Sequence, residues 1–129
     1  MIKIILIMIG GGIGAAFRHG LFIGVHSLTG LTFPVGTLSV NLLGSFLIGL
    51  FWGLFESSHL SPEMRLFLFT GVLGGFTTFS TFMRETTQLL KIGQWREAVL
   101  YLGMSNILGI LLVVLGFFSA HHIVIAMRS

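Results

Sequence analysis

Residues 74–82 read Gly-Gly-Phe-Thr-Thr-Phe-Ser-Thr-Phe, and they lie within residues 66–83, a run without a charged side chain. A helix that served only as a membrane anchor would be built mainly of aliphatic residues. Here a pair of glycines weakens the helix, and four hydroxyl groups are interspersed with three phenylalanines. The composition indicates a segment that handles a polar species inside the bilayer.

The rest of the chain supplies three more apolar segments. With 129 residues, of which 54% are hydrophobic and 9% are charged, the composition is that of an integral membrane protein. Against a requirement of about 20 residues per crossing, the apolar pattern predicts four transmembrane helices, at roughly residues 3–25, 34–55, 62–90 and 96–125. We expect one all-α domain over residues 1–129, with a break in the third helix.

The composition also excludes several kinds of chemistry. The chain has no cysteine, which removes disulfides, thiolate chemistry and cysteine-ligated metals. Its net charge of +3 comes from basic residues scattered at helix ends, so we expect no nucleic-acid partner. The sequence has no evident nucleophile–base pair, phosphate loop or set of metal ligands, and it therefore predicts a protein that is not an enzyme.

The basic residues divide almost evenly between the two predicted sides of the membrane. One side has Lys3, Arg65 and Arg128, and the other has Arg18, Arg84, Lys91 and Arg96. Because positive charge orients membrane helices, this near balance allows insertion in both directions and pairing as an antiparallel dimer. The count equally allows a single orientation that other signals fix.

Polar side chains on the other predicted helices accompany this segment. Asn41 interrupts an apolar span, where it either lines an ion path or bonds to a neighbouring helix. Tyr101 and Ser105 are one turn apart and form a polar line on the fourth helix. Arg18 either extends to the membrane interface or attracts anions into a vestibule.

Residues 74–82 themselves allow two kinds of ion chemistry. Phe79 and Phe82 share a helix face, and the electropositive edges of their rings can hold an anion weakly, as conduction requires. The alternative is that these rings only pack a core. An unwound Gly-Gly pair would expose carbonyl oxygens, which bind cations in broken membrane helices. The hydroxyls either join the path or bond back to the preceding helical turn.

Three stretches together resemble one protein family. They are residues 11–18 (Gly-Gly-Ile-Gly-Ala-Ala-Phe-Arg), residues 36–44 (Gly-Thr-Leu-Ser-Val-Asn-Leu-Leu-Gly) and residues 74–82. Over essentially its full length, the chain resembles the bacterial fluoride channels called Fluc or CrcB. The resemblance implies a multi-pass protein of the cell inner membrane, an antiparallel dual-topology homodimer in the lipid bilayer. Such a dimer exports fluoride passively through two pores along the subunit interface.

The same resemblance implies roles for particular residues. Phe79 and Phe82 match the family's pore phenylalanines, and Gly74 and Thr77 match positions whose backbone carbonyls hold a central structural sodium ion. The other matched positions are the pore-lining Asn41, the hydroxyls Ser80 and Thr81, the polar track Tyr101 and Ser105, and the vestibule arginine Arg18. The chain departs from some relatives at Gly109 and Val113, where the track would continue, and at Met83.

Two other functions explain parts of the sequence. A small proton-coupled dual-topology exporter fits the size, the span count and the charge balance, but it needs a carboxylate inside the membrane. The four acids, Glu56, Glu63, Glu85 and Glu97, are expected near helix ends or in loops. A non-transporting scaffold would use its glycines only to pack helices. The fluoride-selective channel is the main hypothesis.

Overall fold

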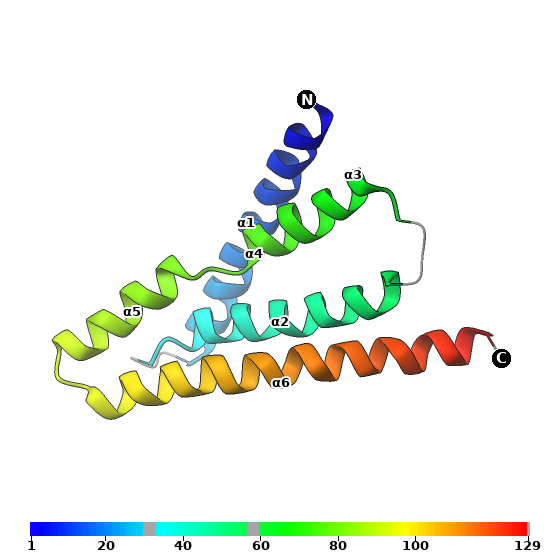
Figure 1. The fold of residues 1–129 in the computed structure, drawn as a ribbon. Helices are drawn as coiled ribbons and strands as arrows, with labels where there is room; N and C mark the ends of the chain where they lie inside the picture. Colours follow the sequence, from blue (N-terminus) through cyan, green and yellow to red (C-terminus); the bar gives the residue numbers. More distant parts are fainter. Residues whose placement is uncertain (30–32, 57–59, 129) are drawn as a thin grey trace.

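A computed structural model of the chain describes residues 1–29, 33–56 and 60–128. Throughout these residues the regular elements are helices, and no strand is present (Figure 1). In chain order they are α1 (Ile2–Thr29), α2 (Val35–Phe55), α3 (Pro62–Arg65), η1 (Leu66–Leu73), α4 (Gly74–Phe76), α5 (Ser80–Lys91) and α6 (Trp95–Arg128).

The helices form four spans that are long and apolar enough to cross a membrane. These spans are Ile2–Leu28, Val35–Phe55, Pro62–Lys91 and Trp95–Arg128. The prediction of an all-α protein with four helices able to cross a membrane is therefore confirmed for the described part of the chain. Two helices extend beyond their predicted ends, since α1 continues to Thr29 instead of residue 25 and α6 continues to Arg128 instead of residue 125.

The second and fourth spans pack side by side and run in the same direction (Figure 1). Gly49 of α2 lies directly on the backbone of Val113 in α6, because a Cβ at this glycine would collide with the Val113 carbonyl oxygen. Small residues at such points allow membrane helices to approach closely, which increases van der Waals contact between them. The ring of Trp52 adds a contact with Phe117 at a centroid distance of 4.7 Å.

The third span is long and bends where its helix is interrupted. Leu66–Leu73 winds as a π-helix, and at its end the Gly74 amide donates to the Phe69 carbonyl five residues back. The α4 helix then ends at Phe76, Thr77 is extended with φ −86° and ψ 158°, and α5 begins at Ser80. The bend between α4 and α5 is visible in Figure 1.

The expectation that the Gly74–Gly75 pair unwinds the helix is wrong. Gly74 has helical angles, φ −64° and ψ −38°. A Cβ on Gly75 would lie 2.5 Å from the Gly11 carbonyl oxygen, so this glycine allows α4 to touch α1. The pair packs two helices together, and the interruption begins after Phe76, at Thr77.

The main buried cluster lies just beyond the interruption, where α2, α5 and α6 meet. It consists of Leu38, Phe82, Leu89, Ala98 and Tyr101. In α5 the buried residues are Phe82, Thr86 and Leu89, which recur at helical spacing on one face. This packing fixes the start of α5 against α2 and α6, and it positions the residues that follow the interruption.

Candidate functional site

Asn41 of α2 holds the interruption with two hydrogen bonds. Its Nδ2 donates to the Thr78 carbonyl oxygen at 3.0 Å, and the Thr78 amide donates to Asn41 Oδ1 at 2.8 Å. These bonds satisfy a backbone donor and a backbone acceptor at a point where the regular helix is absent. One of the two roles that the sequence left open for Asn41, bonding to a neighbouring helix, is thus present.

Side chains also bind the two helix ends at the interruption. At the end of α4, Arg18 Nε donates to the Gly75 carbonyl oxygen at 3.1 Å. At the start of α5, the Thr78 hydroxyl accepts from the Thr81 amide at 3.3 Å. Terminal carbonyls and amides of a helix have no partner within the helix, and a cation suits the carbonyl end. Arg18 therefore reaches into the protein and does not simply extend to the membrane surface.

Because of these bonds, the carbonyls of Gly74 and Thr77 do not receive the hydrogen bonds that a continuous helix would give them. In a continuous helix these carbonyls would accept from the amides of Thr78 and Thr81. The Thr78 amide instead donates to Asn41, and the Thr81 amide donates to the Thr78 hydroxyl. The described residues contain no group of three or more His, Asp or Glu side chains suited to a metal ion. The Gly74 and Thr77 carbonyls do not accept from these two amides.

A cavity of about 370 Å³ lies at the interruption. Its lining comprises Asn41, Gly44, Ser45, Ile48, Phe69, Leu73, Gly74, Thr77, Thr78, Phe79 and Phe82. Gly44 leaves room for the Thr77 side chain, whose methyl group a Cβ at this position would strike. The cavity thus brings together five of the predicted site residues, namely Asn41, Gly74, Thr77, Phe79 and Phe82.

The predicted phenylalanines begin a series of rings in edge-to-face contact. Phe79 and Phe82 have centroids 6.1 Å apart and planes at 80°, and Phe82 meets Tyr101 at 4.8 Å and 87°. The first ring is 71% exposed, whereas Phe82 is only 6% exposed. This arrangement turns ring edges toward neighbouring groups. The outermost ring, that of Phe79, remains exposed on the surface of the single chain.

Ser105 carries a buried hydroxyl that has no hydrogen-bond partner among the described residues. One turn further along α6 stands Gly109, which has no hydroxyl to extend the line. Ser45 of α2 fills this gap, with its Oγ 3.5 Å from where a Gly109 Cβ would stand and 2.8 Å from the Asn41 carbonyl that accepts its proton. Sequence reasoning missed Ser45, although it follows Asn41 by one helical turn.

Glu85 was also missed as a site residue. The fully buried Tyr101 donates from its hydroxyl to Glu85 Oε1 at 3.1 Å, and Thr37 lies beside the same hydroxyl. Glu85 follows Phe82 by three positions on α5, a spacing that could have indicated a shared face. The acid therefore lies half-buried within the third span, six residues before its end, and is not confined to a loop.

The remaining predicted hydroxyls have different surroundings. Thr77 bonds back to the Leu73 carbonyl at 3.1 Å, as one reading of the sequence allowed. Ser80 is exposed at the start of α5. Thr81 and Arg18 line a separate polar cavity on the α1 side of the interruption. The structure therefore does not gather all of the predicted site residues in one place.

Fold and site together define a small four-span membrane protein whose polar groups meet at an interrupted helix. Residues 5–117 match the family described as "CrcB-like protein, Camphor Resistance (CrcB)", and the chain belongs to this family. This finding confirms the resemblance seen in the sequence. It also identifies the chain as a membrane transport protein and not an enzyme.

Several similar proteins carry the name fluoride-specific ion channel FluC. The protein from Parabacteroides distasonis is 45% identical over 124 residues, which cover 96% of this chain and 97% of that protein. The one from Desulfotalea psychrophila is 44% identical over 118 residues, with coverages of 92% and 91%. The one from Shewanella frigidimarina is 45% identical over 116 residues, with coverages of 90% and 94%.

Proposed function

We propose that the protein is a fluoride-selective passive channel that exports fluoride across the cell inner membrane. The observation that carries this proposal is the cavity at the interrupted helix, in a chain whose relatives are named fluoride-specific ion channels. The cavity combines an amide side chain, Asn41, with the rings Phe79 and Phe82. A passive pore needs no coupling residue, because fluoride trapped in the cytoplasm leaves down its electrochemical gradient.

The proposed path replaces the water around fluoride with weak donors. Fluoride is small and strongly hydrated, so hydrogen-bond donors and ring edges must compensate for its lost water without binding it tightly. Ser105 offers a buried hydroxyl with no partner among the described residues, and the edge-to-face rings of Phe79, Phe82 and Tyr101 continue beside it along α5 and α6. Ser80 and Thr81 would contribute hydroxyls near the interruption.

The channel is proposed to be an antiparallel dual-topology homodimer with two pores. The near balance of basic residues between the two sides supports insertion in both directions. Phe79 is 71% exposed in the single chain, and a second copy would cover it. An apolar groove of about 910 Å³, lined by residues of α1, α2, η1 and α4, offers further surface for that copy.

A structural sodium ion is proposed at the centre of this dimer. The Gly74 and Thr77 carbonyls fit it, because the amides that would bond to them in a continuous helix donate to other groups. Two copies would present four such oxygens, and sodium would supply a fixed positive charge where the two interruptions meet. Carbonyls of broken membrane helices bind cations in this way.

The test is fluoride efflux from liposomes that contain the purified protein, recorded with a fluoride-selective electrode and with chloride as the control ion. We expect fluoride but not chloride to leave. Phe79→Ile and Phe82→Ile each remove a ring edge from the path and should lower the fluoride flux by about tenfold or more. Phe118→Ile changes an exposed ring on α6 and should leave the flux unchanged.

Three outcomes of the efflux measurement would contradict this proposal. Wild-type flux in both Phe79→Ile and Phe82→Ile would remove these rings from the path. Flux that depends on an imposed pH gradient would favour a proton-coupled exporter, for which Glu85 is the half-buried carboxylate of the third span. A folded protein without any ion flux would favour a scaffold.

A further inference from the structure

A second polar cavity, of about 230 Å³, lies between α1, α2 and the start of α5. Its polar lining residues are Arg18, His19, Thr37, Thr78, Thr81 and Arg84. None of the described residues that line it is acidic. Two arginines from different helices therefore line one cavity, and no acidic residue among those described lines it with them.

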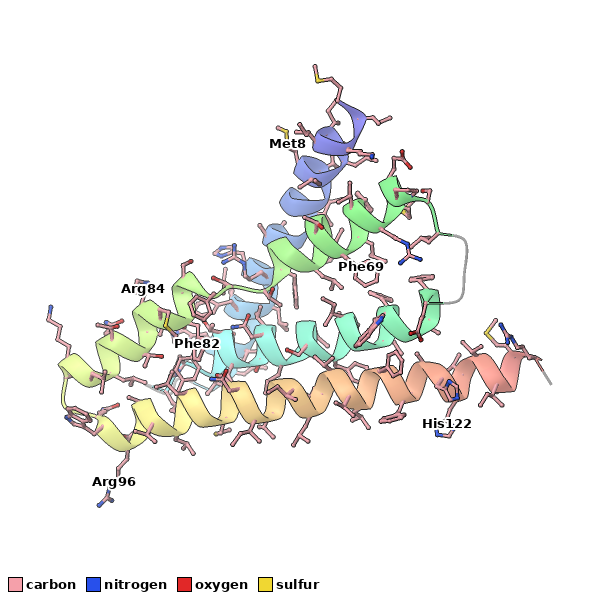
Figure 2. All side chains as sticks on the ribbon, viewed as in Figure 1. Met8, Phe69, Phe82, Arg84, Arg96 and His122 are labelled. Atoms are coloured by element: carbon pink, nitrogen blue, oxygen red, sulfur yellow. The ribbon has the colours of Figure 1, made fainter. Side chains whose placement is uncertain are left out.

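The two arginines that line this cavity have N–H groups that do not bond to the interruption. Arg18 bonds to Gly75 through Nε, which orients its guanidinium plane and leaves the terminal nitrogens for another acceptor. Arg84 is exposed on α5 (Figure 2), and no carboxylate of the described residues forms an ion pair with it. Like charges in one cavity repel each other, so a bound anion would stabilise this arrangement.

We propose that this cavity binds a tetrahedral oxyanion of the sulfate or phosphate type. A guanidinium group binds such an ion through two parallel N–H···O bonds, and two guanidinium groups can contact different oxygens of the same ion. A fluoride ion has a single atom and cannot engage the planar fork in this manner. The volume of the cavity exceeds what a single halide ion would fill, whereas a polyatomic anion can contact both arginines.

The depth of the cavity favours a free ion over a lipid headgroup. Arg84 precedes Lys91, the last residue of α5, by seven positions. At a rise of 1.5 Å per residue this places Arg84 about 10 Å along the helix from its end. A headgroup phosphate remains near the membrane surface, whereas a free ion has no acyl chains that hold it at that surface.

This inference rests in part on the proposed channel function. The cavity adjoins the interruption through Arg18 and Thr78, so an oxyanion there would repel or obstruct an anion that approaches from this side. Sulfate would then slow fluoride efflux without passing through the protein. Binding itself does not require any flux, and the two can be measured separately.

The primary test measures binding of radiolabelled sulfate to the purified full chain in an uncharged detergent. We expect saturable binding that unlabelled phosphate displaces. Arg84→Gln should weaken it by about tenfold or more, because a charge-assisted pair is lost. The matched control is Arg96→Gln, which removes the same charge from an exposed position on α6 (Figure 2) and should bind sulfate like the wild type. Absence of sulfate binding, or equal binding by Arg84→Gln, would overturn the site.

Two further measurements identify the source of the oxyanion and its effect. A short-chain phosphatidic acid that displaces sulfate at lower concentrations than phosphate does would overturn the assignment to a free ion. In liposomes of neutral lipids, sulfate should slow fluoride efflux by the wild type and not by Arg84→Gln. If the protein binds sulfate but conducts no fluoride, the oxyanion site is supported and the proposed channel function is rejected. If it conducts fluoride but binds no sulfate, the channel function is supported and the oxyanion site is rejected.

Discussion

The α2–α6 pair and the interrupted third span bring backbones close together by opposite means. Along α2 and α6 both helices are continuous, and glycines such as Gly49 let one backbone rest on the other. At the interruption, Thr78 gives its backbone donor and acceptor to Asn41 of another helix. In the first region the backbone satisfies itself, and in the second it depends on side chains from elsewhere.

This difference distinguishes the α2–α6 contact, which supports the fold, from the interruption, which forms the candidate site. Continuous helices expose few unsatisfied polar groups to lipid, so the α2–α6 pair can be held mainly by close packing at small residues such as Gly49. The interruption redirects backbone groups, and a cavity lined by Asn41, Gly74 and Thr77 forms beside it. Substitutions at the glycine contacts of the pair, such as Gly49, should therefore change stability alone, whereas substitutions at the interruption should change both stability and transport.

The largest effect is expected for Asn41→Leu. It has nearly the same side-chain size but leaves the Thr78 amide and carbonyl without their partners. Each buried backbone group without a partner costs roughly 1–3 kcal/mol, so stability should fall by about 2–6 kcal/mol. Fluoride flux should fall to background. Unfolding in a denaturing detergent and electrode recordings from liposomes measure the two effects.

Asn106→Leu is the matched control for this change. Asn106 is exposed on α6, and among the described residues its side chain bonds to the Leu102 carbonyl of its own helix. Its stability and flux should remain close to those of the wild type. If Asn41→Leu were as stable as Asn106→Leu, the two Thr78 bonds would not hold the interruption together. The comparison between the two regions would then fail.

An intermediate effect is expected for Gly49→Ala in the α2–α6 pair. Its Cβ would meet the Val113 carbonyl oxygen and push the helices apart, at a cost of about 1–3 kcal/mol from overpacking. The flux of each folded molecule should stay unchanged, because the interruption is untouched. Gly103→Ala has open space around its Cβ and should be neutral. Equal stability of the two variants would show that close backbone approach does not hold the pair together.

The sequence predicted the four spans and the polar third segment because apolar run length and residue type are local properties. The length of an apolar run sets the approximate ends of a membrane helix, and this length does not depend on contacts with other helices. The point of interruption was misplaced because it depends on a distant partner. Asn41 bonds to the backbone amide and carbonyl of Thr78, which lies 37 residues further along the chain. Gly75 remains helical where it packs against Gly11.

The candidate site shows the same division between local and distant information. Phe79, Phe82, Asn41, Gly74 and Thr77 could be selected from residue type and spacing, and they share one cavity. Ser45 and Glu85 were missed because the groups that place them at the site lie on α6, namely Gly109 beside the Ser45 hydroxyl and Tyr101 bonded to Glu85. Such contacts follow from helix packing, which the periodicity of one segment does not specify.

The smallest effect is expected for Thr78→Val, which tests the cap of α5 alone. Valine keeps the shape of threonine and both backbone bonds to Asn41, but it loses the hydroxyl that accepts from the Thr81 amide. Loss of a helix cap costs about 1 kcal/mol, and unfolding in a denaturing detergent should show this decrease. Thr78→Ser keeps the hydroxyl and should restore most of the stability. If valine and serine were equally stable, the Thr78 hydroxyl would add nothing to the stability of the α5 start, which the Asn41 bonds and the buried face of α5 would then hold.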